Sequence, residues 1–187
     1  MSIPPRHAAF WAAFCRTRTT DPTPRFLEAF HFDDNEPSAN ELAALVLQGR
    51  KRATAALLWA HERENKPAPR PGDLSIVTDF AGNAVCVIET VRVDIVAFDE
   101  VSAEFAATEG EGDGSLAYWR RAHDEFFGRE CGRAWGGSPR MTCLSYASAS
   151  RWCSDHRTLP VRAMRRVFPR QGFGRGLRQA QPERDMG

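Results

Sequence analysis

Residues 72–98, GDLSIVTDFAGNAVCVIETVRVDIVAF, decide the fold. Residues 74–78 alternate apolar side chains with those of the opposite face, as a β-strand does, and Gly82 with Asn83 supplies a tight-turn signal. The β-branched run that follows, residues 84–98, predicts a second and longer strand. Because this run is too apolar to carry a solvated face along its whole length, we expect a hairpin that is mostly buried.

Helical patterns lie on both sides of the hairpin. Four segments have apolar residues at helical spacing: 8–14, 38–48, 102–108 and 116–127. The second begins with a capping-box pattern, Ser38 to Glu41, and ends at Gly49. No Gly-rich turn joins a strand to a helix, so the pattern predicts an α+β fold with a barrel-like core and not a doubly wound sheet.

Composition limits the class of protein. The 187 residues are 42% hydrophobic and 26% charged, which suits one domain with a substantial core. No apolar run approaches the roughly 18 residues of a membrane span, and the N-terminus lacks the layout of a secretory signal. We therefore expect a cytoplasmic protein with no membrane partner. Five cysteines, an odd number without a Cys-x-x-Cys pair, favour reduced thiols.

Charge divides the chain near residue 140. Residues 1–140 hold 16 Lys or Arg and 21 Asp or Glu, whereas residues 141–187 hold 9 and 3. In the second part Arg supplies essentially every positive charge, and small polar residues replace the periodic apolar pattern. We expect a disordered, Arg-rich tail over residues 140–187, and no helix or strand after Phe127.

Lysine is rare in this chain, which makes the position of each lysine informative. Of 25 Lys and Arg residues only Lys51 and Lys66 are lysines, and Lys51 stands in the segment GRKRAT, residues 49–54. A lysine acts as a base when its pKa is lowered, and Arg50 and Arg52 would lower the pKa of Lys51 if they lay close. The alternative interpretation is a solvated basic turn that follows the end of a helix.

Three carboxylates, those of Glu109, Glu111 and Asp113, fall within five residues and alternate with glycines. Such a loop can hold a divalent cation, or one carboxylate can raise the pKa of another so that it serves as an acid or base. The spacing does not match an EF-hand calcium loop. The alternative interpretation is a charged loop in which Asp113 and Ser115 cap the next helix.

Aromatic and basic side chains alternate on the last predicted helix. Trp119, His123 and Phe127 share one helical face, and Arg120 and Arg121 lie between them in the sequence. Rings interleaved with Arg suit a nucleic-acid surface, because bases stack on rings and guanidinium groups pair with phosphates. The packing interpretation is favoured, in which the three aromatic residues belong to the core.

Three features together resemble the ASCH domain family: the segment ELAALVLQGRKRATAALLW, the G-R-K-x-x-T turn within it, and the segment from Gly72 to Phe127. The resemblance covers residues 26–132. It implies a PUA-like small β-barrel with flanking helices, and a cleft whose partner is RNA or a modified nucleoside. We expect an N-terminal helix and turn over residues 1–25 and the domain itself over residues 26–139.

The resemblance also implies an activity. Some relatives hydrolyse 4-acetylcytidine, and others of this longer type cleave single-stranded RNA. The amidohydrolase relatives use a Lys, a Thr and a Glu, and the matching positions are Lys51, Thr54 and Glu109. Lys51 would then deprotonate Thr54, and Glu109 would move the proton. Cleavage of single-stranded RNA is the first hypothesis, with an amidohydrolase or a non-catalytic RNA-binding module as the alternatives.

RNA cleavage would need further groups. The residues expected to bind RNA are Arg50, Arg52, Arg120 and Arg121. Glu109, with Glu111 or Asp113, would hold Mg²⁺ or Mn²⁺, and the ion would stabilise the reacting phosphate.

The end of the chain departs from the family. The family ends in a strand resembling D-D-M-P-V-V-C-E-R-F-x-V-V, whereas residues 141–153 read MTCLSYASASRWC. Back-translated and read one base earlier, permitted codons for these residues spell D-D-L-P-V-V-C-E-R-F-E-V-V. Met141 and Trp152 each have a single codon, which argues against chance agreement. We infer a frameshift near Pro139, so that the final strand is missing or replaced and residues 140–187 are out of frame.

A one-base correction before Met141 is expected to raise the melting temperature, because it restores an apolar, β-branched strand. The net stability of a domain of this size is only about 5–15 kcal/mol, so one strand is a large part of it. Thermal unfolding of the two chains side by side checks this. A corrected protein that melts no higher than the present chain would show that the tail is genuine structure.

Overall fold

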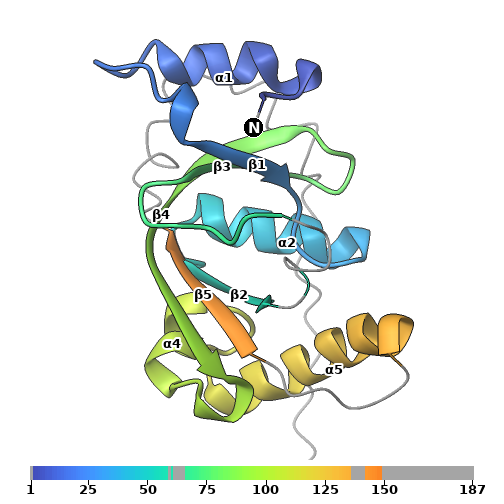
Figure 1. Ribbon diagram of the computed structural model, residues 1–187. Coiled ribbons are helices and arrows are strands. Elements are labelled where there is room, and N and C mark those ends of the chain that lie inside the picture. The colour runs from blue at the N-terminus through green and yellow to red at the C-terminus, as the bar shows by residue number, and fades with distance from the viewer. Residues whose placement is uncertain (1, 59, 61–65, 136–141, 149–187) are drawn as a thin grey trace, which may run out of the picture. The chain divides into compact units, whose positions relative to one another are not determined.

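A computed structural model describes residues 2–58, 60, 66–135 and 142–148 of the chain, with side-chain surroundings as far as residue 130. In these residues four α-helices lie beside a five-stranded sheet, as Figure 1 shows. The α+β class is therefore confirmed. Among the described residues, no helix has the length and hydropathy that a membrane crossing requires.

The sheet has the strand order β1-β3-β4-β5-β2. The strands are β1 (Phe26–Phe30), β2 (Ala53–Leu57), β3 (Leu74–Thr78), β4 (Ala84–Ala97) and β5 (Thr142–Ser148). β1 and β3 are parallel, and the other neighbouring pairs are antiparallel. Because β1 and β2 are the two edges, the sheet is open. The expected closure into a small β-barrel is wrong.

The predicted hairpin forms the centre of this sheet. The first half of β4 pairs with β3, and its second half pairs with β5. The register of the second pairing shifts between Thr90 and Arg92, where Val91 is exposed. This irregularity lets one long strand bend and serve both halves of the sheet, as its curved course in Figure 1 shows.

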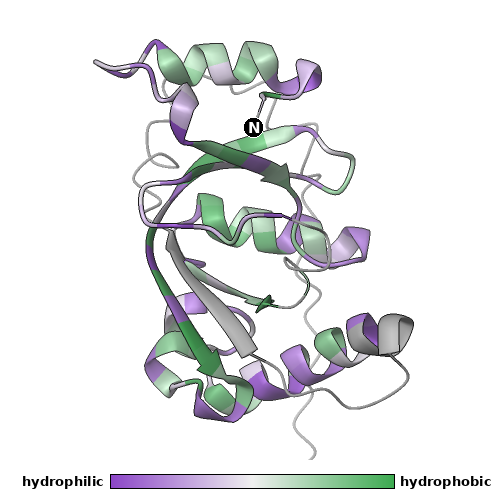
Figure 2. Ribbon diagram, in the orientation of Figure 1, coloured by the Kyte–Doolittle hydropathy of each residue, from purple (hydrophilic) through white to green (hydrophobic). Residues whose placement is uncertain are grey.

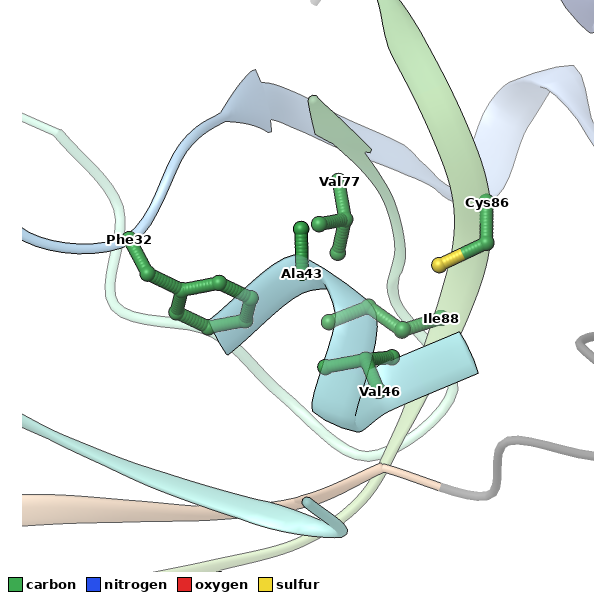
Figure 3. Close-up of a cluster of buried hydrophobic side chains, with 6 residues drawn as sticks. All are labelled: Phe32, Ala43, Val46, Val77, Cys86 and Ile88. Carbon is green, nitrogen blue, oxygen red and sulfur yellow. The ribbon is translucent and has the colours of Figure 1, made fainter. Parts of the chain in front are cut away.

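Helix α2 (Glu36–Leu47) occupies the space between the two edge strands (Figure 1). Its inner face packs on β3 and β4 in a cluster drawn in Figure 3: Phe32, Ala43, Val46, Val77, Cys86 and Ile88. Burial of these side chains holds the helix against the sheet. In the described sheet, β1 and β2 do not pair with each other.

The ends of α2 differ in part from the prediction. Its N-cap is Asn35, whose Oδ1 accepts the N–H of Ser38 at 3.0 Å, so the predicted capping box at Ser38 is wrong by one turn. Asn is a favoured N-cap, and Pro37 is tolerated in the first turn. At the other end Gly49 follows the helix with a φ of 70°, as predicted for a helix terminus.

The remaining helices are α1 (Ala8–Cys15), α4 (Ala103–Glu109) and α5 (Leu116–Trp135). Figure 2 shows hydrophobic residues concentrated in α1, α2 and the strands β1, β3 and β4, and hydrophilic residues along much of the coloured part of α5. The expectation that no element follows Phe127 is wrong, because α5 continues to Trp135 and β5 follows. Backbone pairing of β5 with strands on both sides outweighs its weak apolar pattern. The predicted disordered tail is therefore wrong for residues 142–148, which form β5, and its residues 140, 141 and 149–187 lie outside the described residues.

Candidate functional site

The side chain of Lys51 is the centre of a buried group of charges. Lys51 lies between α2 and β2, is 1% exposed, and donates its backbone N–H to the carbonyl of Leu45 at 3.1 Å. Its ammonium donates to Glu109 Oε1 at 2.9 Å and to Glu111 Oε1 at 2.5 Å. The turn after α2 therefore brings together three residues that the sequence analysis singled out.

Both carboxylate oxygens of Glu109 are occupied. Glu109 ends α4 and is fully buried. Its Oε1 accepts from Lys51 and from the backbone N–H of Ala55 at 3.2 Å. Its Oε2 accepts from the indole N–H of Trp119 and faces His123 Nε2 at 3.6 Å. Glu109 is thus fixed from four directions by β2, α5 and Lys51.

His123 completes the surroundings of Glu109. Its Nδ1 lies 3.0 Å from the backbone carbonyl of Trp119. A carbonyl only accepts hydrogen bonds, so Nδ1 carries a proton, and Nε2 is the nitrogen that faces Glu109. The imidazole also stacks on the Trp119 ring, with 4.1 Å between ring centroids. A proton on Nε2 would add a second cation beside the buried carboxylate.

The charges of this group set one another's protonation. Burial by itself would raise the pKa of Glu109, but the neighbouring Lys51 ammonium and the imidazole of His123 outweigh it and lower the pKa to about 2. Burial would lower the pKa of Lys51, but the charges of Glu109 and Glu111 outweigh it and raise that pKa. At neutral pH Lys51 is therefore an ammonium ion and Glu109 a carboxylate.

The predicted lowering of the pKa of Lys51 by its neighbours in the sequence is wrong in direction. Arg50 and Arg52 are exposed, whereas two carboxylates contact the Lys51 ammonium directly. Direct contact in a buried site outweighs more distant charges in water. The alternative interpretation, a solvated basic turn, is also wrong for Lys51, because its side chain is buried.

One glycine makes the close approach of the two loops possible. Gly110 has a φ of 68°, and a Cβ there would lie 2.3 Å from the carbonyl oxygen of Arg50. The chain therefore turns sharply after α4 and packs its backbone against the residue that precedes Lys51.

A cavity of about 600 Å³ adjoins these charges. Its lining includes Thr54, Glu109, Glu111 and His123, but Lys51 does not belong to it and lies behind the two carboxylates. No hydrogen bond from any described residue reaches the hydroxyl of Thr54. The structure thus brings the three matched positions to one place: Thr54 and Glu109 belong to the cavity lining, and the side chains of Glu109 and Lys51 are both buried.

The cavity lining has an excess of negative charge. Its described acidic residues are Glu28, Asp33, Glu41, Glu109, Glu111, Glu125 and Glu130, and its basic residues are Lys66 and Arg129. The guanidinium of Arg129 already lies 3.7 Å from Asp33 and 3.3 Å from Asp34. An acidic lining of this kind repels phosphate groups and accepts neutral or donor-rich ligands.

The predicted divalent-cation site is not assembled. Glu109 and Glu111 both bind the Lys51 ammonium, whereas Asp113 is exposed and its Oδ1 accepts the N–H of Ser115 at 2.8 Å. In the part of the chain that the structure describes, no group of three or more His, Cys, Asp or Glu residues is placed to hold a metal ion. These residues do not fit Mg²⁺ or Mn²⁺. The capping interpretation of Asp113 and Ser115 is confirmed, since Ser115 Oγ accepts the N–H of Tyr118 at 3.1 Å.

The four arginines predicted to bind RNA are dispersed. Arg50 and Arg52 line a second hollow, of about 440 Å³, and are not part of the cavity lining. Arg120 donates to a backbone carbonyl at 2.9 Å, and the guanidinium of Arg121 lies 5.4 Å from the centre of the Tyr118 ring. Of these residues only Tyr118 belongs to the cavity lining.

Two residues of the site, Trp119 and His123, were predicted as core, with a nucleic-acid surface as the alternative. Trp119 and His123 are buried with Phe127, as the packing interpretation expects. The indole N–H of Trp119 and the Nε2 atom of His123, however, both face Glu109. The signal for this second role is the i, i+4 spacing of two aromatic residues that each carry a polar edge.

The comparisons with known proteins agree with this architecture. The ASCH domain family model matches residues 28–146. An ASCH domain from Lactobacillus crispatus JV V101 is 32% identical with a TM-score of 0.71, over 78% of this chain and 94% of that one. Protein EF3133 from Enterococcus faecalis V583 is 25% identical with a TM-score of 0.67, over 81% of this chain and 92% of that one. No curated protein matches the chain.

Replacing Glu109 by Gln is expected to lower the free energy of unfolding by about 3–5 kcal/mol, because Lys51 loses a buried partner. The matched control is Glu104→Gln, an exposed carboxylate on the same helix, which should change it by less than about 0.5 kcal/mol. Urea unfolding near pH 7 measures both. Equal effects of the two substitutions would contradict the buried ion pair.

The same variant has an expected pH dependence. The folded pKa of Glu109, about 2, lies below its ordinary value of 4.5, so its stabilisation is complete above pH 4.5 and is lost as the pH falls toward 2. The difference in unfolding free energy between wild type and Glu109→Gln should therefore shrink between about pH 5 and pH 2. A difference that stays constant over this range would count against the assigned pKa.

Proposed function

The chain belongs to the ASCH domain family, and from that premise we propose that it is a hydrolase that takes one nucleoside of an RNA into its cavity and cleaves an amide bond on the base. The family supports an RNA-related domain. The observation that carries the proposal is Thr54, which belongs to the cavity lining together with Glu109 and Glu111 and whose hydroxyl has no hydrogen-bond partner among the described residues.

The size and walls of the cavity suit a nucleoside. Its volume of about 600 Å³ falls within the usual range for small-molecule sites. The described aromatic residues of its lining are Phe30, His31, Phe32, Tyr118, His123 and Phe126. Such rings stack on a nucleobase whatever its sequence neighbours, while a few polar groups fix its orientation.

Charge favours amide hydrolysis over cleavage of the RNA backbone. A phosphodiester in the cavity would meet an acidic lining, and the carboxylates of Glu109 and Glu111 are engaged with Lys51 and do not fit a divalent cation. An amide is neutral and meets no such repulsion. The amidohydrolase alternative is therefore better supported than cleavage of single-stranded RNA.

In the proposed reaction Thr54 is the nucleophile. Its oxygen forms a bond to the acyl carbon while the C–N bond of the amide breaks, and the hydroxyl proton passes to the leaving nitrogen. Water then attacks the acyl-threonine, which releases the carboxylic acid and restores the hydroxyl. Glu111 is the carboxylate placed to carry the proton, because its Oε2 has no partner among the described residues and its side chain is 15% exposed.

Lys51 and Glu109 act differently from what the sequence predicted. With its pKa raised, Lys51 does not serve as the base for Thr54. We assign it to positioning, since its ammonium holds one oxygen of each carboxylate. Both oxygens of Glu109 are occupied, so its carboxylate links α5, through Trp119 and His123, to β2, the strand that carries Thr54.

Substituting Thr54 by Val should reduce hydrolysis of 4-acetylcytidine about 1,000-fold or more, because the nucleophilic oxygen is lost while the β-branched shape is kept. Thr54→Ser should keep a measurable part of the rate. Thr90→Val, which removes another hydroxyl from the same lining, is the matched control and should change the rate far less. Chromatographic detection of released cytidine measures all three.

The outcomes separate the alternatives. Activity of Thr54→Val equal to that of the control would remove Thr54 from the mechanism. We expect EDTA to leave the rate unchanged; cleavage of single-stranded RNA that EDTA abolishes would instead restore the ribonuclease hypothesis. A folded protein that binds cytidine and hydrolyses neither substrate would be a binding module.

A further inference from the structure

A second hollow lies next to the cavity and has the opposite electrostatic character. Its volume is about 440 Å³, and its lining is Gly49, Arg50, Arg52, Ala107, Gly110, Asp113 and Gly114. This lining contains two arginines and one carboxylate, whereas the acidic residues of the cavity lining outnumber the basic ones. The hollow is therefore the basic part of this region.

The two arginines are available for a ligand. The backbone N–H groups of Arg50 and Arg52 donate at 3.0 Å to the carbonyls of Leu45 and Thr108, which fixes the segment in place. Their side chains are exposed and form no ion pair with any described residue. Guanidinium groups held by a rigid backbone and free of a carboxylate partner suit a phosphate, which they bind through paired N–H groups.

One loop separates the hollow from the cavity. Glu109, Glu111 and Gly112 line the cavity, while Gly110 and Asp113 line the hollow. Neighbouring residues of the same backbone thus face different sites, and consecutive Cα atoms are only about 3.8 Å apart. A ligand that crosses this loop can place one part in each site.

We propose that the hollow binds a backbone phosphate of single-stranded RNA and so anchors the chain whose nucleoside enters the cavity. The division of charge matches a nucleotide, in which the base is neutral and the phosphate is anionic. The identification of the chain as RNA rests on the proposed function, since that function places a nucleoside in the cavity. A phosphate contact of this kind positions the chain and reads no sequence.

Asp113 opposes this binding. Its carboxylate lies in the same hollow, where it accepts the N–H of Ser115 at 2.8 Å. Asn at this position keeps the capping oxygen and removes the charge. We therefore expect the affinity for RNA to fall when the two arginines are replaced and to rise when the charge of Asp113 is removed.

The test measures binding of a fluorescent ten-nucleotide single-stranded RNA by the full chain. The double variant Arg50→Gln/Arg52→Gln should raise Kd about tenfold and reduce the slope of log K against log salt by about 0.7, the value for one lost phosphate contact on a single strand. Its Kd for free cytidine should not change. Asp113→Asn should lower Kd for the RNA about threefold, and Arg120→Gln is the matched loss of an arginine outside the hollow.

Each outcome bears on the proposal. Unchanged RNA binding by the double variant, an equal loss in Arg120→Gln, or an equal loss for free cytidine would overturn it. Competition by single-stranded DNA of the same length supports a phosphate contact. Competition by inorganic phosphate at a concentration similar to that of the competing DNA would point to a site for a free anion and would overturn the RNA anchor. RNA binding that follows the predicted pattern without any amide hydrolysis would refute the proposed function and leave the anchor standing.

Discussion

The contact between the Lys51 ammonium and the Glu109 carboxylate is the interaction on which the rest of the site depends. Either charge alone, buried as both are, would cost several kcal/mol. The pair therefore requires that the turn after α2, the end of α4 and the middle of α5 meet at one point. Gly110 allows that meeting, and the indole of Trp119 completes it. The buried ion pair thus holds together three segments that are far apart in the sequence, because none of them could bury its charge alone.

This constraint also distributes charge around the cavity. Glu109 and Glu111, which hold the Lys51 ammonium, belong to the acidic cavity lining, while Arg50 and Arg52 on either side of Lys51 in the sequence line the other hollow. Neighbouring residues of the same loop therefore line two different sites, an acidic cavity and a basic hollow. A ligand with a neutral base and an anionic backbone matches both.

Local patterns predicted the elements that local interactions determine. The hairpin of residues 74–97, the end of α2 at Gly49 and the helix-capping role of Ser115 follow from turn and cap chemistry. The edge strands β1 and β2 were missed because they are short and gain their stability from partners distant in the sequence. The direction of the pKa of Lys51 was missed for the same reason, since carboxylates that follow it by 58 and 60 residues determine it.

A carboxyl ¹³C NMR titration of Glu109 in the folded protein tests the buried ion pair most directly. The signal is assigned by its absence in Glu109→Gln. With the pKa held at about 2 by Lys51 and His123, the Glu109 carboxyl carbon should keep the shift of an ionised group as the pH falls through 4.5 and should move only near the acid limit of the fold. A midpoint near the ordinary value of 4.5 would show a solvated carboxyl without a buried cation, and would contradict the arrangement from which the site and its proposed chemistry follow.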